Sequence, residues 1–110
     1  MDVIFHAHHA AVSDRMRQRA LRAVERIGTR LKRTVDAVVR FEGDGRTRRV
    51  EIVLHAPRHC HLVATGQGAY FGPALGDAIV RLEAQLRHHK RNLKGRHRAA
   101  QDPSLVPKSA

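Results

Sequence analysis

The sequence predicts an α+β fold in which two helices cover one face of a four-stranded β-sheet, in the order β-α-β-β-β-α. Four segments alternate apolar and polar residues, as strands with one buried face do. Two longer segments repeat apolar residues at helical spacing, so each helix has one apolar face to bury. Packing both helices on the same face of one sheet buries those faces in two layers. The 110 residues are enough for one such domain and too few for two.

The strands follow from period-two alternation, which starts with Val3 and Phe5 near the N-terminus. Gly43-Asp44-Gly45 is a strong turn signal and separates the second strand from the third. Glycines at positions 66 and 68 end the fourth strand. We expect strands at residues 2–8, 35–41, 50–56 and 61–67, of which the last three form a meander.

The first helix is expected from about residue 14 to residue 32, with Ser13 as its N-cap. Its apolar stripe would bury Ala20, Val24 and Ile27. Gly28 weakens the last turn by roughly 1 kcal/mol relative to alanine, so the helix is expected to loosen there.

The second helix is expected to begin near Phe71, with Pro73 in its first turn, and to end near Lys94-Gly95. Residues 96–110 show no periodicity and include two prolines. We therefore divide the chain into a domain at residues 1–95 and a flexible tail at residues 96–110.

Charge gives the first indication of function. Lysine and arginine number 21 against 10 acidic residues, a formal net charge of +11. A small domain this basic indicates an anionic partner, with nucleic acid the first candidate and an anionic membrane surface the second. The chain has no Trp, one Tyr and three Phe, so it has few aromatic side chains on which bases could stack. This favours contacts to phosphate and sugar on folded nucleic acid.

The expected compartment is the cytoplasm. A single cysteine, Cys60, excludes an internal disulfide and fits a reducing environment. No segment approaches the roughly 20 apolar residues of a membrane span, so we expect a soluble protein with no membrane partner.

Arginines of the first helix fall on one side of it. On a helical wheel six of them lie within an arc of roughly 80°, about a third of a turn from the apolar stripe. The six are Arg15, Arg19, Arg22, Arg26, Arg30 and Arg33. The second helix carries Arg87, Lys90, Arg91 and Lys94 opposite its apolar stripe. If the helices lie side by side, these ten residues form one basic surface suited to phosphate, the alternative being an ordinary solvated face.

Histidines suggest two other chemistries. His55, His59, Cys60 and His61 surround one turn, but their spacing matches no familiar zinc finger and there is no CxxC. A histidine-dependent nuclease would need a paired acid and base, which the sequence does not indicate. We expect no catalytic residues, no metal, no cofactor and no small-molecule substrate.

One segment of the second half has a recognisable pattern. Residues 65–94 read TGQGAYFGPALGDAIVRLEAQLRHHKRNLK, and the positions that carry the pattern are Leu82, Gln85, Leu86, His89, Lys90, Leu93 and Lys94. In these residues the chain resembles the short ribosome hibernation-promoting and ribosome-associated inhibitor proteins. The resemblance covers about residues 2–95, including the order of strands and helices. The second helix departs from the pattern at its start, where this chain has Tyr70-Phe71-Gly72, and at Gly76, where an acid is common.

The resemblance implies a domain shaped like double-stranded-RNA-binding domains that binds the small ribosomal subunit near the decoding centre. Such a protein occupies the space of messenger RNA and transfer RNA and inhibits translation in idle ribosomes under stress. Its partners would be the 30S subunit, the 70S ribosome and 16S rRNA, and it would be a monomer when free. By position, the rRNA contacts would fall to Arg22, Arg26, Arg30, Arg87, Lys90, Arg91 and Lys94.

Two further expectations concern form and rivals. The chain should resemble the short form, because it stops where long-form members continue into a second domain. Rival functions are a general double-stranded-RNA binder, a histidine-dependent metal protein or nuclease, and an interaction module for acidic proteins.

Overall fold

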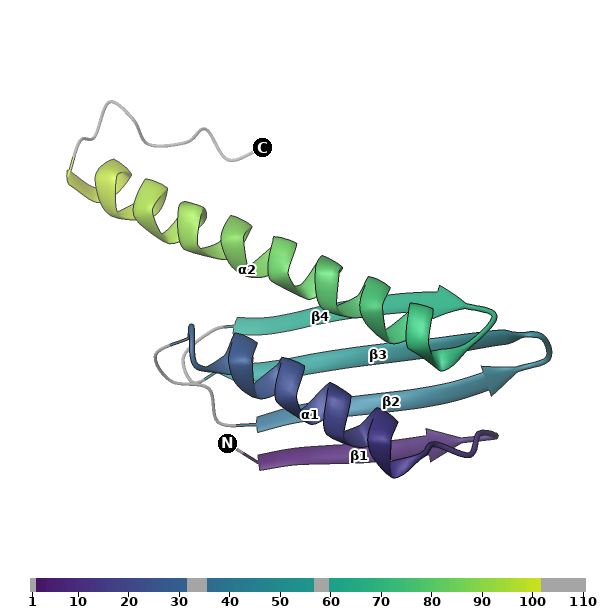
Figure 1. The fold of residues 1–110 in the computed structure, drawn as a ribbon. Helices are drawn as coiled ribbons and strands as arrows, with labels where there is room; N and C mark the ends of the chain where they lie inside the picture. The colour runs from purple at the N-terminus through teal and green to yellow at the C-terminus, as the bar shows by residue number, and fades with distance from the viewer. Residues whose placement is uncertain (1, 32–35, 57–59, 102–110) are drawn as a thin grey trace.

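The order of elements is the one expected from the sequence (Figure 1). The computed structural model describes residues 2–31, 36–56 and 60–101, with the backbone alone described for 56, 60 and 89–101. The elements are β1 (Asp2–His8), α1 (Asp14–Gly28), β2 (Asp36–Asp44), β3 (Thr47–Ala56), β4 (Cys60–Gly68) and α2 (Phe71–Gln101).

The strands form one mixed sheet in the order β1-β2-β3-β4. β1 runs parallel to β2, whereas β3 is antiparallel to both of its neighbours. Figure 1 shows both helices on the same face of this sheet, α1 over its β1–β2 side and α2 over its β3–β4 side. The predicted two-layer α+β fold is confirmed.

The hairpin between β2 and β3 is tighter than predicted. β2 continues through Gly43 to Asp44, which pairs with Thr47, so the loop is the two residues Gly45 and Arg46. Gly45 has a φ of 59°, a left-handed conformation that glycine adopts without steric cost. Gly43 serves packing instead, because a Cβ there would lie 2.4 Å from the His9 carbonyl oxygen.

α1 begins as predicted and ends early. The Ser13 hydroxyl accepts a hydrogen bond from the Met16 amide at 3.1 Å, which caps the helix. The predicted end at residue 32 is wrong, because α1 stops at Gly28 and the chain tightens into bonds such as Leu31 N–H to Gly28 O at 3.0 Å. Glycine followed by a β-branched threonine gives two weak helix formers at this point.

α2 is longer than predicted. It runs through Gly95 to Gln101, because the arginine, alanine and glutamine residues after the glycine favour helix enough to offset its cost of about 1 kcal/mol. Its 31 residues span about 46 Å, against about 30 Å for the nine residues of β4, and Figure 1 shows it extending past the sheet. Within the described residues, neither helix is long and apolar enough to cross a membrane.

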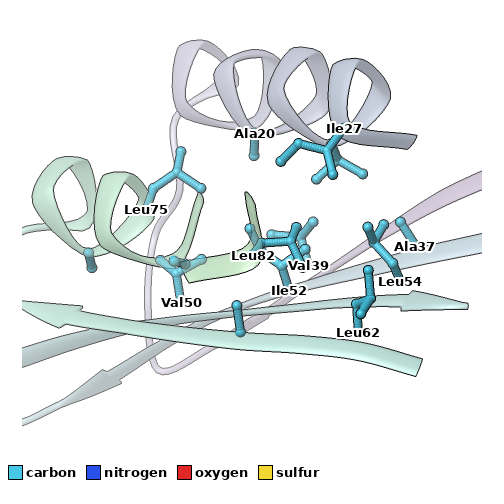
Figure 2. Close-up of a cluster of buried hydrophobic side chains, with 14 of the residues drawn as sticks. Ala20, Ile27, Ala37, Val39, Val50, Ile52, Leu54, Leu62, Leu75 and Leu82 are labelled. Carbon is cyan, nitrogen blue, oxygen red and sulfur yellow. The ribbon is translucent and has the colours of Figure 1, made fainter. Parts of the chain in front are cut away.

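The core lies between the helices and the sheet (Figure 2). Aliphatic side chains from both helices meet alternate residues of the strands, and Phe41 packs edge-on against Phe71 with 5.4 Å between ring centroids. The buried residues of this cluster are Ala20, Val24, Ile27, Ala37, Val39, Phe41, Val50, Ile52, Leu54, Leu62, Ala64, Ala74, Leu75, Ala78, Leu82 and Leu86. Among the described residues no charged or polar side chain is buried. Every described charge therefore lies at the surface, where it is available to a partner.

Gln85 joins α2 to the edge of the sheet. Its amide oxygen accepts a hydrogen bond from the Val63 amide at 3.2 Å, and its amide nitrogen donates to the Val63 carbonyl. β4 is an edge strand, so these backbone groups lack a neighbouring strand on that side. The Gln85 side chain takes the place of that neighbour and fixes the helix along β4.

Replacing Gln85 with alanine should lower the free energy of unfolding by about 1 kcal/mol. Two hydrogen bonds are lost, but water can reach the exposed edge and replace them in part. Chemical denaturation measures the change. Gln67→Ala is the control, because Gln67 is an exposed glutamine on β4, the strand that contains Val63. Equal stability of the two variants would show that the bonds to Val63 contribute nothing.

Candidate nucleic-acid interface

A groove of about 620 Å³ runs between the two helices. Its wall on the α1 side carries four arginines, whose spacing of four, three and four residues keeps them on one helix face. The wall on the α2 side is lower, because only a glycine and an isoleucine line it. The lining residues are Arg15, Gln18, Arg19, Ala23, Arg22 and Arg26 of α1 and Gly76 and Ile79 of α2. The groove is thus a strip of positive charge with a hydrocarbon floor.

Arg19 crosses the groove and contacts α2. Its Nη1 atom donates to the Gly72 carbonyl oxygen at 3.3 Å. Gly72 and Gly76 stand one turn apart on the α2 face toward α1, and a Cβ at either position would lie 3.7 or 3.6 Å from the guanidinium nitrogens. These are ordinary van der Waals distances, so a methyl group at either position would pack against the Arg19 guanidinium without a clash.

Arg26 forms the other charged contact between the helices. Its Nη2 atom lies 3.6 Å from Glu83 Oε1 on α2. The Arg26 side chain is 68% exposed, so this pair adds little stability, within about 1 kcal/mol. The sequence analysis did not identify Glu83, because it lies on α2 and no spacing along α1 reveals it.

The structure separates the ten predicted binding residues into groups. Arg15, Arg19, Arg22 and Arg26 are brought together in the groove. Arg30 is exposed in the turn after α1, because the helix has already ended. Arg87 is exposed on α2. Arg33 lies outside the described residues, as do the side chains of Lys90, Arg91 and Lys94, although the backbone of these three is part of α2. The role of all ten in binding rRNA stays a prediction.

Acidic residues gather on the opposite side of the molecule. The face of the sheet without helices, here called the open face, carries five of the ten acids of the chain by strand alternation. They are Asp2, Asp36, Glu42, Asp44 and Glu51. Arg40 and Arg49 are the basic residues among them, and both form ion pairs there. The molecule therefore has a basic helical face and an acidic open face.

Four of the described histidines form two pairs. The rings of His55 and His61, neighbours on β3 and β4, meet edge to face with 4.5 Å between centroids. His8 and His9 make a similar contact at 4.1 Å. Across the part of the chain that is described, no three His, Cys, Asp or Glu residues are grouped to hold a metal ion. His59 and the side chain of Cys60 fall outside that part.

The sequence matches none of the curated proteins. Among solved structures, the fold is similar to a ribosomal subunit interface protein from Coxiella burnetii. That match has a TM-score of 0.75 and 15% identity, and it covers 83% of this chain and 99% of that one. The N-terminal domain of Thermus thermophilus Protein Y is also similar, with a TM-score of 0.70, 20% identity and coverage of 81% and 99%.

At these identities the two structures bear on the fold alone. The family comparison is stronger, because residues 3–94 match the family described as "Sigma 54 modulation protein / S30EA ribosomal protein". The match covers both helices' contributions to the groove and all four strands. It confirms the resemblance seen in the sequence, and the chain belongs to the Sigma 54 modulation protein / S30EA ribosomal protein family.

Proposed function

We propose that this protein binds the small ribosomal subunit through its helical face and inhibits translation by occupying a site near the decoding centre. The observation that carries the proposal is the groove in which four arginines of α1 line one channel against α2. Membership of the S30EA family and the similarity of fold to a ribosomal subunit interface protein support a ribosomal target.

The geometry favours phosphate contacts. Arginine guanidinium groups bind phosphate oxygens with two parallel hydrogen bonds, and those of Arg15, Arg22 and Arg26 are exposed at the groove. A row of guanidinium groups along a helix suits the regularly spaced phosphates of an RNA strand. Base reading is not required, because phosphate contacts position a protein without reading sequence.

Charge separation supports the choice of face. The open face carries five acids, which repel phosphate, whereas the helical face carries the groove arginines and Arg87. A protein of this kind docks on rRNA with its helices inward. Bound there, it excludes messenger RNA and transfer RNA by volume, without catalysis, in the cytoplasm of stressed cells.

Co-sedimentation across a salt series tests the proposal. The protein is mixed with 30S subunits, 70S ribosomes or a generic RNA duplex, and the bound fraction is measured as salt rises. Each phosphate contact releases counterions, so the logarithm of affinity falls linearly with the logarithm of salt, by roughly 0.9 per contact on duplex. The same series is run with Arg87, Lys90, Arg91 and Lys94 replaced by alanine.

Saturable one-to-one binding to 30S and 70S, surviving salt that strips the duplex and weakened in the variant, is the expected result. Protection of 16S rRNA near the decoding centre from chemical modification then locates the site. Equal loss from all three RNAs as salt rises would reduce the protein to a general RNA-binding polycation and would refute the proposal.

A further inference from the structure

An aliphatic row crosses the open face from one edge of the sheet to the other. Backbone pairing places Ile4 of β1 beside Val38 of β2, Val38 beside Val53 of β3, and Val53 beside Val63 of β4. Ile4 and Val63 at the two ends are 51% and 43% exposed. Their neighbours along each strand pack into the core, so this row points away from both helices. Val38 and Val53 between them are half-buried, and an aliphatic row that crosses a whole sheet face marks a candidate contact surface.

The charged residues beside this row are arranged as opposites on the two central strands. Arg40 on β2 is paired with Glu51 on β3, with 4.0 Å between Nη1 and Oε1. Two residues further along β2 the signs are reversed. Glu42 on β2 is paired with Arg49 on β3, at 3.7 Å between Oε2 and Nη1. Positive and negative charges therefore exchange places across the midline of the sheet.

The centre of the open face, at these two ion pairs, is therefore complementary to itself. Consider a two-fold axis that runs parallel to the strands, midway between β2 and β3. It places each β2 residue opposite its β3 pairing partner, but the partner then belongs to the second copy. Arg40 then faces Glu51 of the second copy, and Glu42 faces its Arg49. The aliphatic row meets its own copy, with Val38 over Val53, which is the repeating contact that an isologous interface requires.

The net charge of +11, which favours a free monomer, does not oppose this arrangement strongly. In a dimer joined by the open faces both helical faces point outward. Counting about 10 Å for each packed layer, the two grooves lie roughly 30 Å apart. That distance is several times the Debye length, which is about 8 Å at physiological salt, so the repulsion between the two grooves is screened.

We propose that a second copy of this chain binds the open face and forms a weak two-fold dimer. Four strands and seven residues give a face of about 19 by 23 Å, or about 900 Å² in total from both copies. Stable complexes bury about 1,200–2,000 Å², so this dimer exchanges rapidly and is populated only at high protein concentration. The inference is independent of the proposed ribosomal function, because it uses the opposite face.

Sedimentation equilibrium of the full chain and two charge-reversed variants tests the dimer. Arg40→Glu leaves an acid at both paired positions, 40 on β2 and 51 on β3. Glu51→Arg leaves an arginine at both of these positions. Each variant alone should associate at least about tenfold more weakly than the original protein, because like charges then face each other. An equimolar mixture of the two should recover association, since each supplies the sign that the other lacks.

Arg81→Glu is the matched control. It also reverses one arginine of an exposed ion pair, the contact of Arg81 Nε with Asp77 Oδ1 at 3.3 Å, but it lies on α2. Its association should equal that of the original protein. A protein that stays monomeric at every concentration overturns the proposal, and so does a mixture that associates no better than its components.

Discussion

Replacing Arg15, Arg22 and Arg26 together with glutamine should lower affinity for the 30S subunit at least about a hundredfold. Each guanidinium lines the groove, and each charge-assisted hydrogen bond to phosphate contributes roughly 1–3 kcal/mol. The slope of affinity against salt should also become shallower, because fewer counterions are released on binding. Arg19 is kept in this variant, since its bond to Gly72 joins the two helices.

The matched control removes three arginines elsewhere, with Arg40, Arg46 and Arg49 replaced by glutamine. The net charge falls by the same amount, but these residues belong to the open face and to the hairpin loop. Binding to 30S subunits in a filter or sedimentation assay should change little. If both triple variants lose affinity equally, net charge and not the groove determines binding, and the site assigned here is wrong.

Replacing Gly66 with alanine should lower the free energy of unfolding by about 3 kcal/mol, the upper end for overpacking a core. A Cβ at this position would lie 2.0 Å from the Ala74 carbonyl oxygen and 2.5 Å from the Ala78 amide nitrogen. Both are backbone atoms of α2, so no side-chain rotation relieves the contact, and the helix must move away from β4. Stabilities of domains are about 5–15 kcal/mol, which makes the loss a large fraction.

Gly68→Ala provides the comparison for this prediction. There the nearest backbone atom, the Ala74 nitrogen, is 3.5 Å from the added carbon, an ordinary contact. Denaturant melts should show a much smaller loss for this variant than for Gly66→Ala. The Gly66 variant should also bind 30S subunits more weakly, because moving α2 widens the groove. Equal stability of the two variants would contradict the close approach of α2 to β4.

Periodicity was sufficient to predict the architecture. Alternation located all four strands, because one face of the sheet is buried and the other is not, and the apolar stripes located both helices. Helix ends were harder to predict. Leu31, four residues after Ile27, suggested that α1 continues past Gly28, where only a loosening was expected, whereas Gly95 suggested an end that α2 passes. Local propensity decides such ends by small energies, which periodicity does not measure.

The site was predictable in part. Four groove arginines lie on α1 alone, so a helical wheel brings them together without knowledge of the fold. The contributions of α2 depend on the distance between two helices far apart in sequence. Gly72, Gly76 and Glu83 therefore gave no signal of a shared groove, although the four-residue spacing of the two glycines was visible. Gln85 was noticed as part of a family pattern, but its bond to the sheet edge was not.

The acids of the open face bear on how the protein would approach an anionic partner. Positive charge over the helices and negative charge behind the sheet give the molecule an electric dipole across its short dimension. Near a polyanion such a dipole feels a torque as well as an attraction, so the molecule rotates before it touches. The search for a correct orientation is what usually slows association below the diffusion limit. A protein with this distribution of charge meets a polyanion with its helical face first, so a larger fraction of its encounters leads to binding.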